Sequence, residues 1–192
     1  MSPGVIVAVV IAVIVVAIPL MIFNRLVTLR NTVQSSWHGI DVELQRRHDL
    51  VPNLVETVKG YAAHEQDVLQ RVTEARTHAL DAGSAAGEKV APEQELSGAL
   101  RSLFAVAEGY PDLKASRSFL ELQQELANTE NRLALARRIY NANVQAFNTA
   151  VQKIPNNLVA KVGDFTPAEF FRIDPVVASA PAPEAGFGSP TA

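Results

Sequence analysis

The sequence predicts an all-α protein: an N-terminal transmembrane helix, an antiparallel up-down four-helix bundle, a short capped C-terminal helix and a disordered tail. The first observation behind this prediction is an uninterrupted apolar run at residues 5–23. The second is the spacing of apolar residues beyond it, which alternates between three and four positions as on one face of a helix. The chain therefore divides into an anchor (residues 1–23), a bundle (24–174) and a tail (175–192).

The apolar run, residues 5–23, contains no charged, amide or hydroxyl side chain. A helix of this length spans roughly 30 Å, the hydrocarbon thickness of a bilayer. No basic residue precedes the run and no small-x-small cleavage site follows it, so we interpret it as a retained anchor in the cell membrane. Arg25 and Arg30 follow closely, and the positive-inside rule then predicts an external N-terminus and a cytoplasmic bundle.

Residues 24–48 form the first predicted bundle helix, and Pro52 follows it. Proline removes an amide hydrogen and disfavours helix at the preceding residue, so we favour a turn here with Asp49 as the N-cap of the next helix. A kinked continuous helix is the alternative. The glycines of residues 81–88 and the turn at 109–112 bound the later helices, which are expected at residues 51–80, 91–108 and 113–154.

Residues 165–170 contain the pattern of a helix start. Thr166 is placed as the N-cap, Pro167 as the first helical residue and Glu169 as the reciprocal member of a capping box. Phe165 and Phe170 would pack on each other as a hydrophobic staple. A short helix is therefore expected from Pro167, with its phenylalanines docked on the bundle. Residues 175–192 are rich in Pro, Ala and Gly, which is typical of a disordered tail.

Catalytic and metal-binding patterns are weak in this chain. It has no Cys and four His. His64-Glu65 lacks the second His of a zincin motif, and no Asp or Glu has a His three positions later, as the Glu-x-x-His motif of di-iron bundles requires. No nucleotide-binding motif is found, so we expect neither a cofactor nor enzymatic activity. The formal net charge of -3 is well mixed, which makes nucleic acid an unsuitable partner. We expect His64 to face solvent and Glu65 to pair with an Arg across the helix seam; phosphorylation of His64 is the alternative.

Two long segments carry a resemblance to a known family. Residues 38–65, HGIDVELQRRHDLVPNLVETVKGYAAHE, and residues 137–160, RRIYNANVQAFNTAVQKIPNNLVA, followed by Phe170-Phe171, resemble the signatures of the LemA family of bacterial membrane proteins. The resemblance implies a single-pass membrane protein with an antiparallel α-helical bundle. It supplies no catalytic residues.

Polar residues inside these segments are the candidate site residues. One group surrounds the expected bend and would lock it as a polar network: Asp41, Arg46, Arg47, Asn53 and Glu56. A second group lies in or beside the apolar seams, where polar residues fix helix register at a cost in stability: Glu65, Thr129, Tyr140, Asn141 and Asn143. We favour a structural role for both groups, because polar residues in bundles mostly satisfy one another. A ligand site between the helices is the alternative.

Two functions from different classes fit these observations. The first is a non-catalytic interaction or scaffolding module, tethered to the bilayer through residues 5–23, whose partners are other membrane or envelope proteins. The second is a component of a membrane signalling system, as a phosphoacceptor or regulator. Homo-oligomerisation is open in both.

Overall fold

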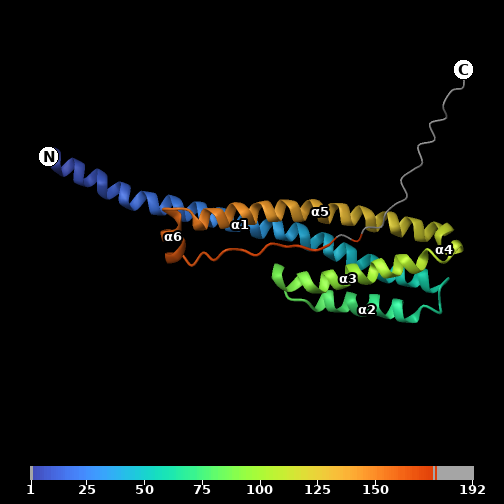
Figure 1. Ribbon diagram of the computed structural model, residues 1–192. Coiled ribbons are helices and arrows are strands. Elements are labelled where there is room, and N and C mark those ends of the chain that lie inside the picture. The colour runs from blue at the N-terminus through green and yellow to red at the C-terminus, as the bar shows by residue number, and fades with distance from the viewer. Residues whose placement is uncertain (1, 175, 177–192) are drawn as a thin grey trace, which may run out of the picture.

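The protein is all-α, as predicted. The computed structural model describes residues 2–174 and Val176, apart from the side chain of Val9. Within this part of the chain the protein forms these helices (Figure 1): α1 Pro3–Lys59, α2 Gln66–Asp81, α3 Ala86–Ala107, α4 Pro111–Ala115, α5 Arg117–Gln152 and α6 Asn156–Val162. The predicted disordered tail, residues 175–192, lies outside the described residues except for Val176.

Helix α1 contains 57 residues and is therefore about 85 Å long. It includes both the apolar run and the first bundle helix, so the chain passes from anchor to bundle without a break. The favoured turn at Pro52 is wrong, because α1 continues through this proline to Lys59. Proline cannot donate to the carbonyl four residues earlier, but that carbonyl, on His48, accepts a hydrogen bond from Arg76 Nε of α2 at 2.8 Å. The helix therefore loses a donor without leaving an acceptor unsatisfied.

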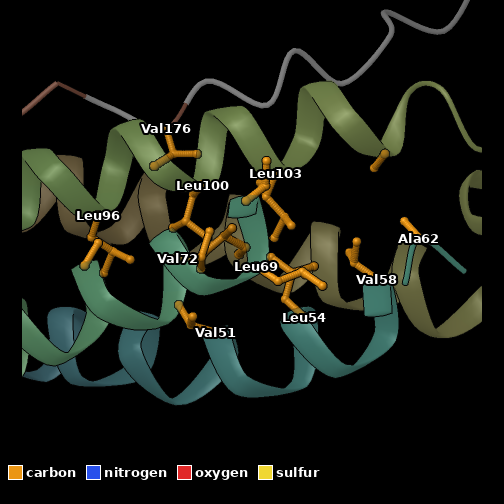
Figure 2. Close-up of a cluster of buried hydrophobic side chains, with 14 of the residues drawn as sticks. Val51, Leu54, Val58, Ala62, Leu69, Val72, Leu96, Leu100, Leu103 and Val176 are labelled. Carbon is orange, nitrogen blue, oxygen red and sulfur yellow. The ribbon is translucent and has the colours of Figure 1, made fainter. Parts of the chain in front are cut away.

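The distal half of the molecule is the four-helix bundle. The chain reverses after Lys59, and α2 and α3 form an antiparallel pair against the C-terminal half of α1, with α5 returning alongside α1 (Figure 1). Figure 2 shows the core that these helices enclose. Each helix contributes residues at helical spacing, among them Val51, Leu54 and Val58 of α1, Leu69 and Val72 of α2, and Leu96, Leu100 and Leu103 of α3. We call this group of side chains the distal core.

The proximal half, nearer the apolar run, has a different construction. Here α1 and α5 form the main pair, and their seam buries Leu26, Ile40, Val144 and Phe147, with the partly buried Ala86 and Val90 of α3 packed against it. The chain after α6 runs back along this pair in an extended conformation (Figure 1). Its buried Phe165, Phe171 and Ile173 complete what we call the proximal core.

The predicted capped helix from Pro167 is therefore wrong: residues 165–174 are extended and form what we call the strap. The short helix lies earlier, at α6. Docking of this segment on the bundle is confirmed, since Phe165 and Phe171 are both buried and Phe170 is half-buried.

Candidate functional site

Charged side chains are buried between the two cores. Arg47 and His48 of α1 lie between Leu44 of the proximal core and Val51 of the distal core. Glu130 of α5 likewise lies between core residues, and Glu93 and Ser97 come from the central part of α3. All five of these polar residues are buried. We call them the ion cluster, and they connect the three helices α1, α3 and α5.

Glu93 is the centre of the ion cluster. One carboxylate oxygen, Oε2, accepts from Arg47 Nη2 at 2.6 Å, and the other, Oε1, lies 2.8 Å from His48 Nε2. Arg47 Nη2 also donates to the Glu93 backbone carbonyl at 3.0 Å, while Nη1 donates to Glu130 Oε1 at 3.1 Å and to Ser97 Oγ at 3.2 Å. A guanidinium presents a rigid planar set of donors, which explains how one residue contacts both other helices.

This geometry indicates a structural role for the ion cluster. The side chains of Arg47 and Glu93 have 0% exposure, so water does not screen their attraction and neither ion is stable alone. One guanidinium faces two carboxylates, and the His48 imidazole contacts the second oxygen of Glu93. Because every member is matched to a partner on another helix, the ion cluster specifies how α1, α3 and α5 align.

The residues expected around a bend at Pro52 are not gathered in one place. Arg47 alone enters the ion cluster. Asp41 pairs with Lys89 of α3 at 3.0 Å, Arg46 lies 3.9 Å from Glu43, and Glu56 lies 3.6 Å from Lys59 on the surface. Asn53 has an exposed side chain, and its carbonyl accepts from Thr57 Oγ1.

The partners of Arg47, namely Glu93, Ser97 and Glu130, and the adjacent His48 were not among the predicted site residues. A signal for them exists. Glu93 precedes Leu96 by three positions, and Glu130 lies between Leu126 and Leu133 at steps of four and three, so each charge occupies an interior position of its helix.

The seam residues have separate roles. Glu65 accepts a hydrogen bond from the Tyr110 hydroxyl at 3.1 Å. Its partner is therefore a tyrosine and not the expected Arg. This hydrogen bond, with a smaller contribution from desolvation, raises the pKa of Tyr110. Thr129 is buried, and its hydroxyl donates to the Glu125 carbonyl at 2.9 Å. Asn143 lines an open groove between α1 and α5.

Two asparagines of α5 hold the strap by its backbone. Asn148 donates from Nδ2 to the Ala168 carbonyl at 2.9 Å and accepts from the Ala168 amide at 2.8 Å. Asn141, two helical turns earlier, does the same with Phe171 at 2.9 and 3.0 Å. Each side-chain amide thus satisfies both backbone groups of one strap residue, as a neighbouring β-strand would. These bonds explain why the strap is extended rather than helical.

Further contacts hold the strap on both sides of Phe171. The Tyr140 hydroxyl donates to the Glu169 carbonyl at 2.9 Å, and Arg137 donates to the Ile173 carbonyl. Gln94 of α3 exchanges two hydrogen bonds with Asp174, at 2.6 and 2.8 Å. Burial raises the pKa of Tyr140, and the nearby carboxylate of Glu169 adds to the effect.

Aromatic side chains fill the space under the strap. The Phe171 ring lies 5.2 Å from that of Trp37, and the Phe165 ring lies 5.4 Å from that of Phe23. The Arg30 guanidinium lies 5.1 Å from the Phe165 ring centre, in the range of a cation–π contact. Arg25, the other predicted orientation charge, is exposed.

The apolar N-terminal part of α1 lies largely outside the bundle, and it meets the rest of the protein near its end, at Ile22 and Phe23. It is the one helix in the described part of the chain that is long and apolar enough to cross a membrane, and none of that apolar window is buried. Exposed aliphatic surface of this extent is unfavourable in water, and it is consistent with a membrane anchor.

The fold and the site define a membrane-associated helical-bundle protein whose buried polar residues hold its own helices and strap together. The family model described as "LemA family" matches residues 36–187, and the chain belongs to that family. Among curated proteins it is similar to magnetosome protein MamQ 1 of Paramagnetospirillum magneticum, with 28% identity over 83% of this chain and 68% of the relative. It is also similar to protein LemA of Metamycoplasma hominis, with 25% identity over 79% of this chain and 72% of the relative.

Proposed function

We propose that the protein is a single-pass, non-catalytic scaffold that binds other membrane or envelope proteins through the outer face of α1 and α5. The observation that carries the proposal is how the polar residues of its two signature segments are used. Arg47 and His48 hold neighbouring helices, while Tyr140, Asn141 and Asn148 hold the strap. Groups that are already matched inside the protein are unsuited to binding a substrate. Recognition then falls to the surface.

The outer face of α1 and α5 has the character of a protein-binding surface. Leu135 and Ile139 of α5 lie one turn apart and are 58% and 51% exposed. Ile139 lines an open groove whose other wall is α1, and the remaining lining residues are Thr28, Asn31, Thr32, Ser35, Ser36 and Asn143.

Several hydroxyls in this groove are already engaged. Those of Thr28, Thr32 and Ser36 donate to carbonyls of their own helix at 2.8 to 3.0 Å, so the groove is less polar than its residue types suggest. A groove of small side chains beside exposed aliphatic residues accommodates the apolar face of an amphipathic helix.

The continuous α1 explains why such a module would be anchored in this way. Because one helix includes both the membrane segment and the inner wall of the bundle, the binding face is held at a defined height above the bilayer. With Arg25 and Arg30 on the cytoplasmic side, the bundle lies in the cytoplasm and the N-terminus outside.

In-cell photo-cross-linking tests the binding face. A photoreactive amino acid at Ile139 should form discrete cross-links to membrane or envelope proteins. The matched control is Arg138, which is exposed and lies at the same height, about 100° around the helix. With the photoreactive amino acid at Ile139, the substitution Leu135→Asp should strongly reduce the cross-links without loss of helical content, because the Leu135 side chain is on the surface. Equal cross-linking from the two positions would contradict the proposal.

A second measurement separates the scaffold from a phosphoacceptor. His64 is exposed in the connection between α1 and α2, and a scaffold does not need its imidazole. His64→Ala should leave the cellular phenotype and the Ile139 cross-links intact. Phosphate on His64, or loss of function in a folded His64→Ala protein, would favour the signalling function instead.

A further inference from the structure

We propose that the protein has a second membrane contact besides its anchor. It is formed by residues 153–162, which we call the proximal corner. These residues are the connection that follows α5 and the whole of α6. In this proposal the proximal corner lies in the lipid headgroup region, with Ile154, Leu158 and Val162 inserted at the boundary with the acyl chains. This contact does not depend on the protein-binding function proposed above.

The proximal corner is located where the apolar run of α1 ends. Helix α6 contacts both α1 and α5, and its Ala160 is buried in the proximal core together with Leu26. Just after α6, the Phe165 ring makes an edge contact with Phe23, the last residue of the apolar run, at 5.4 Å. Figure 1 shows α6 at the end of the bundle from which the N-terminal part of α1 emerges. A bilayer around the apolar run therefore has its surface at the level of the proximal corner.

The side chains of the proximal corner are unusually exposed for their type. Ile154, Leu158 and Val162 are 84%, 63% and 91% exposed, more than any other large apolar residue described beyond residue 23. Single exposed apolar residues are normal on a soluble surface. These three differ because Leu158 and Val162 lie four positions apart on one face of α6, Ile154 lies in the turn just before that helix, and α6 contacts α1 near the end of the apolar run.

The charges around the three apolar residues fit a lipid surface. Lys153 and Lys161 are exposed on either side of Leu158, and a lysine can lie with its stem along apolar surface and its ammonium among lipid phosphates. Arg25 and Arg30 are exposed on α1 close to the same level. Asp164, just after α6, is the exposed acidic residue nearby. The basic excess favours anionic lipids.

Two contacts with the bilayer would restrict the orientation of the bundle more than a single contact does. A lone transmembrane helix leaves the tilt and rotation of its attached domain to packing and interfacial residues. An inserted proximal corner on one side of α1 removes part of that freedom, and the orientation of the bundle relative to the membrane is then defined.

Fluorescence of a single attached probe tests this proposal. The native chain has no Cys, so Leu158→Cys and Val162→Cys each provide a unique position for the polarity-sensitive NBD group. The full chain is placed in nanodiscs of phosphatidylglycerol and phosphatidylcholine, one chain per disc. The matched control is Leu120→Cys, which is 50% exposed near the N-terminus of α5, at the other end of the bundle. All three side chains are exposed, so the variants should fold, and far-UV circular dichroism checks this.

The two positions in the proximal corner should show blue-shifted emission, quenching by nitroxide-labelled lipids and protection from aqueous iodide. The Leu120 position should show the opposite pattern. If all three probes respond alike, with emission typical of water and free access to iodide, the proposal is wrong. Protection at Leu158 that appears only when several chains share a vesicle would also overturn it, because a second copy of the chain would then cover this surface.

Discussion

Glu93→Ala should be among the most destabilising single substitutions in the bundle. Glu93 is the residue that contacts both Arg47 and His48, through separate carboxylate oxygens at 2.6 and 2.8 Å. Its removal would leave the Arg47 guanidinium, which has 0% exposure, with Glu130 as its remaining carboxylate partner. Breaking a buried ion pair in this way costs about 3–5 kcal/mol of unfolding free energy. In a chain of this size, that corresponds to a decrease in Tm of about 6–20 °C.

Thermal unfolding of the full chain in detergent micelles, followed by circular dichroism, measures the effect. Glu130→Ala should cost less, about 1–3 kcal/mol, because Arg47 keeps its shorter contact with Glu93. The matched control is Glu95→Ala on the same helix, since Glu95 has a half-exposed side chain and pairs with His78 on the surface. It should change the unfolding free energy by no more than about 0.5 kcal/mol.

A double substitution separates the lost attraction from the charge left behind. Arg47→Met combined with Glu93→Ala removes both ions, so its cost should be smaller than the sum of the two single substitutions. The reasoning is refuted if Glu93→Ala and Glu95→Ala unfold at the same temperature. It is also refuted if the costs of Arg47→Met and Glu93→Ala simply add.

Three further predictions concern the strap and the anchor. Asn141→Ala and Asn148→Ala should each weaken strap docking by about 1–3 kcal/mol, seen as faster hydrogen exchange in residues 165–174; unchanged exchange would refute the docking role. The raised pKa of Tyr140 means that its contribution to stability is fully present below the unfolded value of about 10 and is lost as pH rises through the higher folded value. Strap docking should therefore weaken at strongly alkaline pH, and less so in Tyr140→Phe, which has no ionisable hydroxyl. A reporter fused to the C-terminus should be active only in its cytoplasmic form, and replacing Arg25 and Arg30 with Gln should reduce that preference.

The sequence predicted the elements whose signal is local and repeated. The apolar run, the helical spacing from Leu26 to Leu44 and the seam of α5 from Phe119 to Phe147 all predicted helix, and helix is observed. A periodic pattern over many residues reports the buried face directly, because each apolar residue gains from the same burial. The candidate site was predicted less completely. Arg47, Tyr140 and Asn141 were named, but their partners were not.

Local patterns misled where a distant partner competes for the same backbone group. Thr166 and Glu169 have the spacing of a capping box, which would satisfy amides at a helix start. In the folded protein, Asn141, Asn148 and Tyr140 satisfy the strap backbone from α5 instead. Burial of Phe165 and Phe171 further stabilises the extended conformation of the strap. No local sequence pattern encodes this burial or the hydrogen bonds from α5.

By itself, the sequence therefore determined the apolar segment that is long enough to cross a membrane, the all-α class and the faces on which the long helices pack. The tertiary structure decided whether the chain turns at Pro52, whether residues 165–174 are helix or strap, and which charges meet in the ion cluster. The physical reason is the same in each case. A backbone carbonyl, a strap amide or a buried charge must find a partner, and here the partners are Arg76, Asn141 and Glu93, each far along the chain from the group that it satisfies.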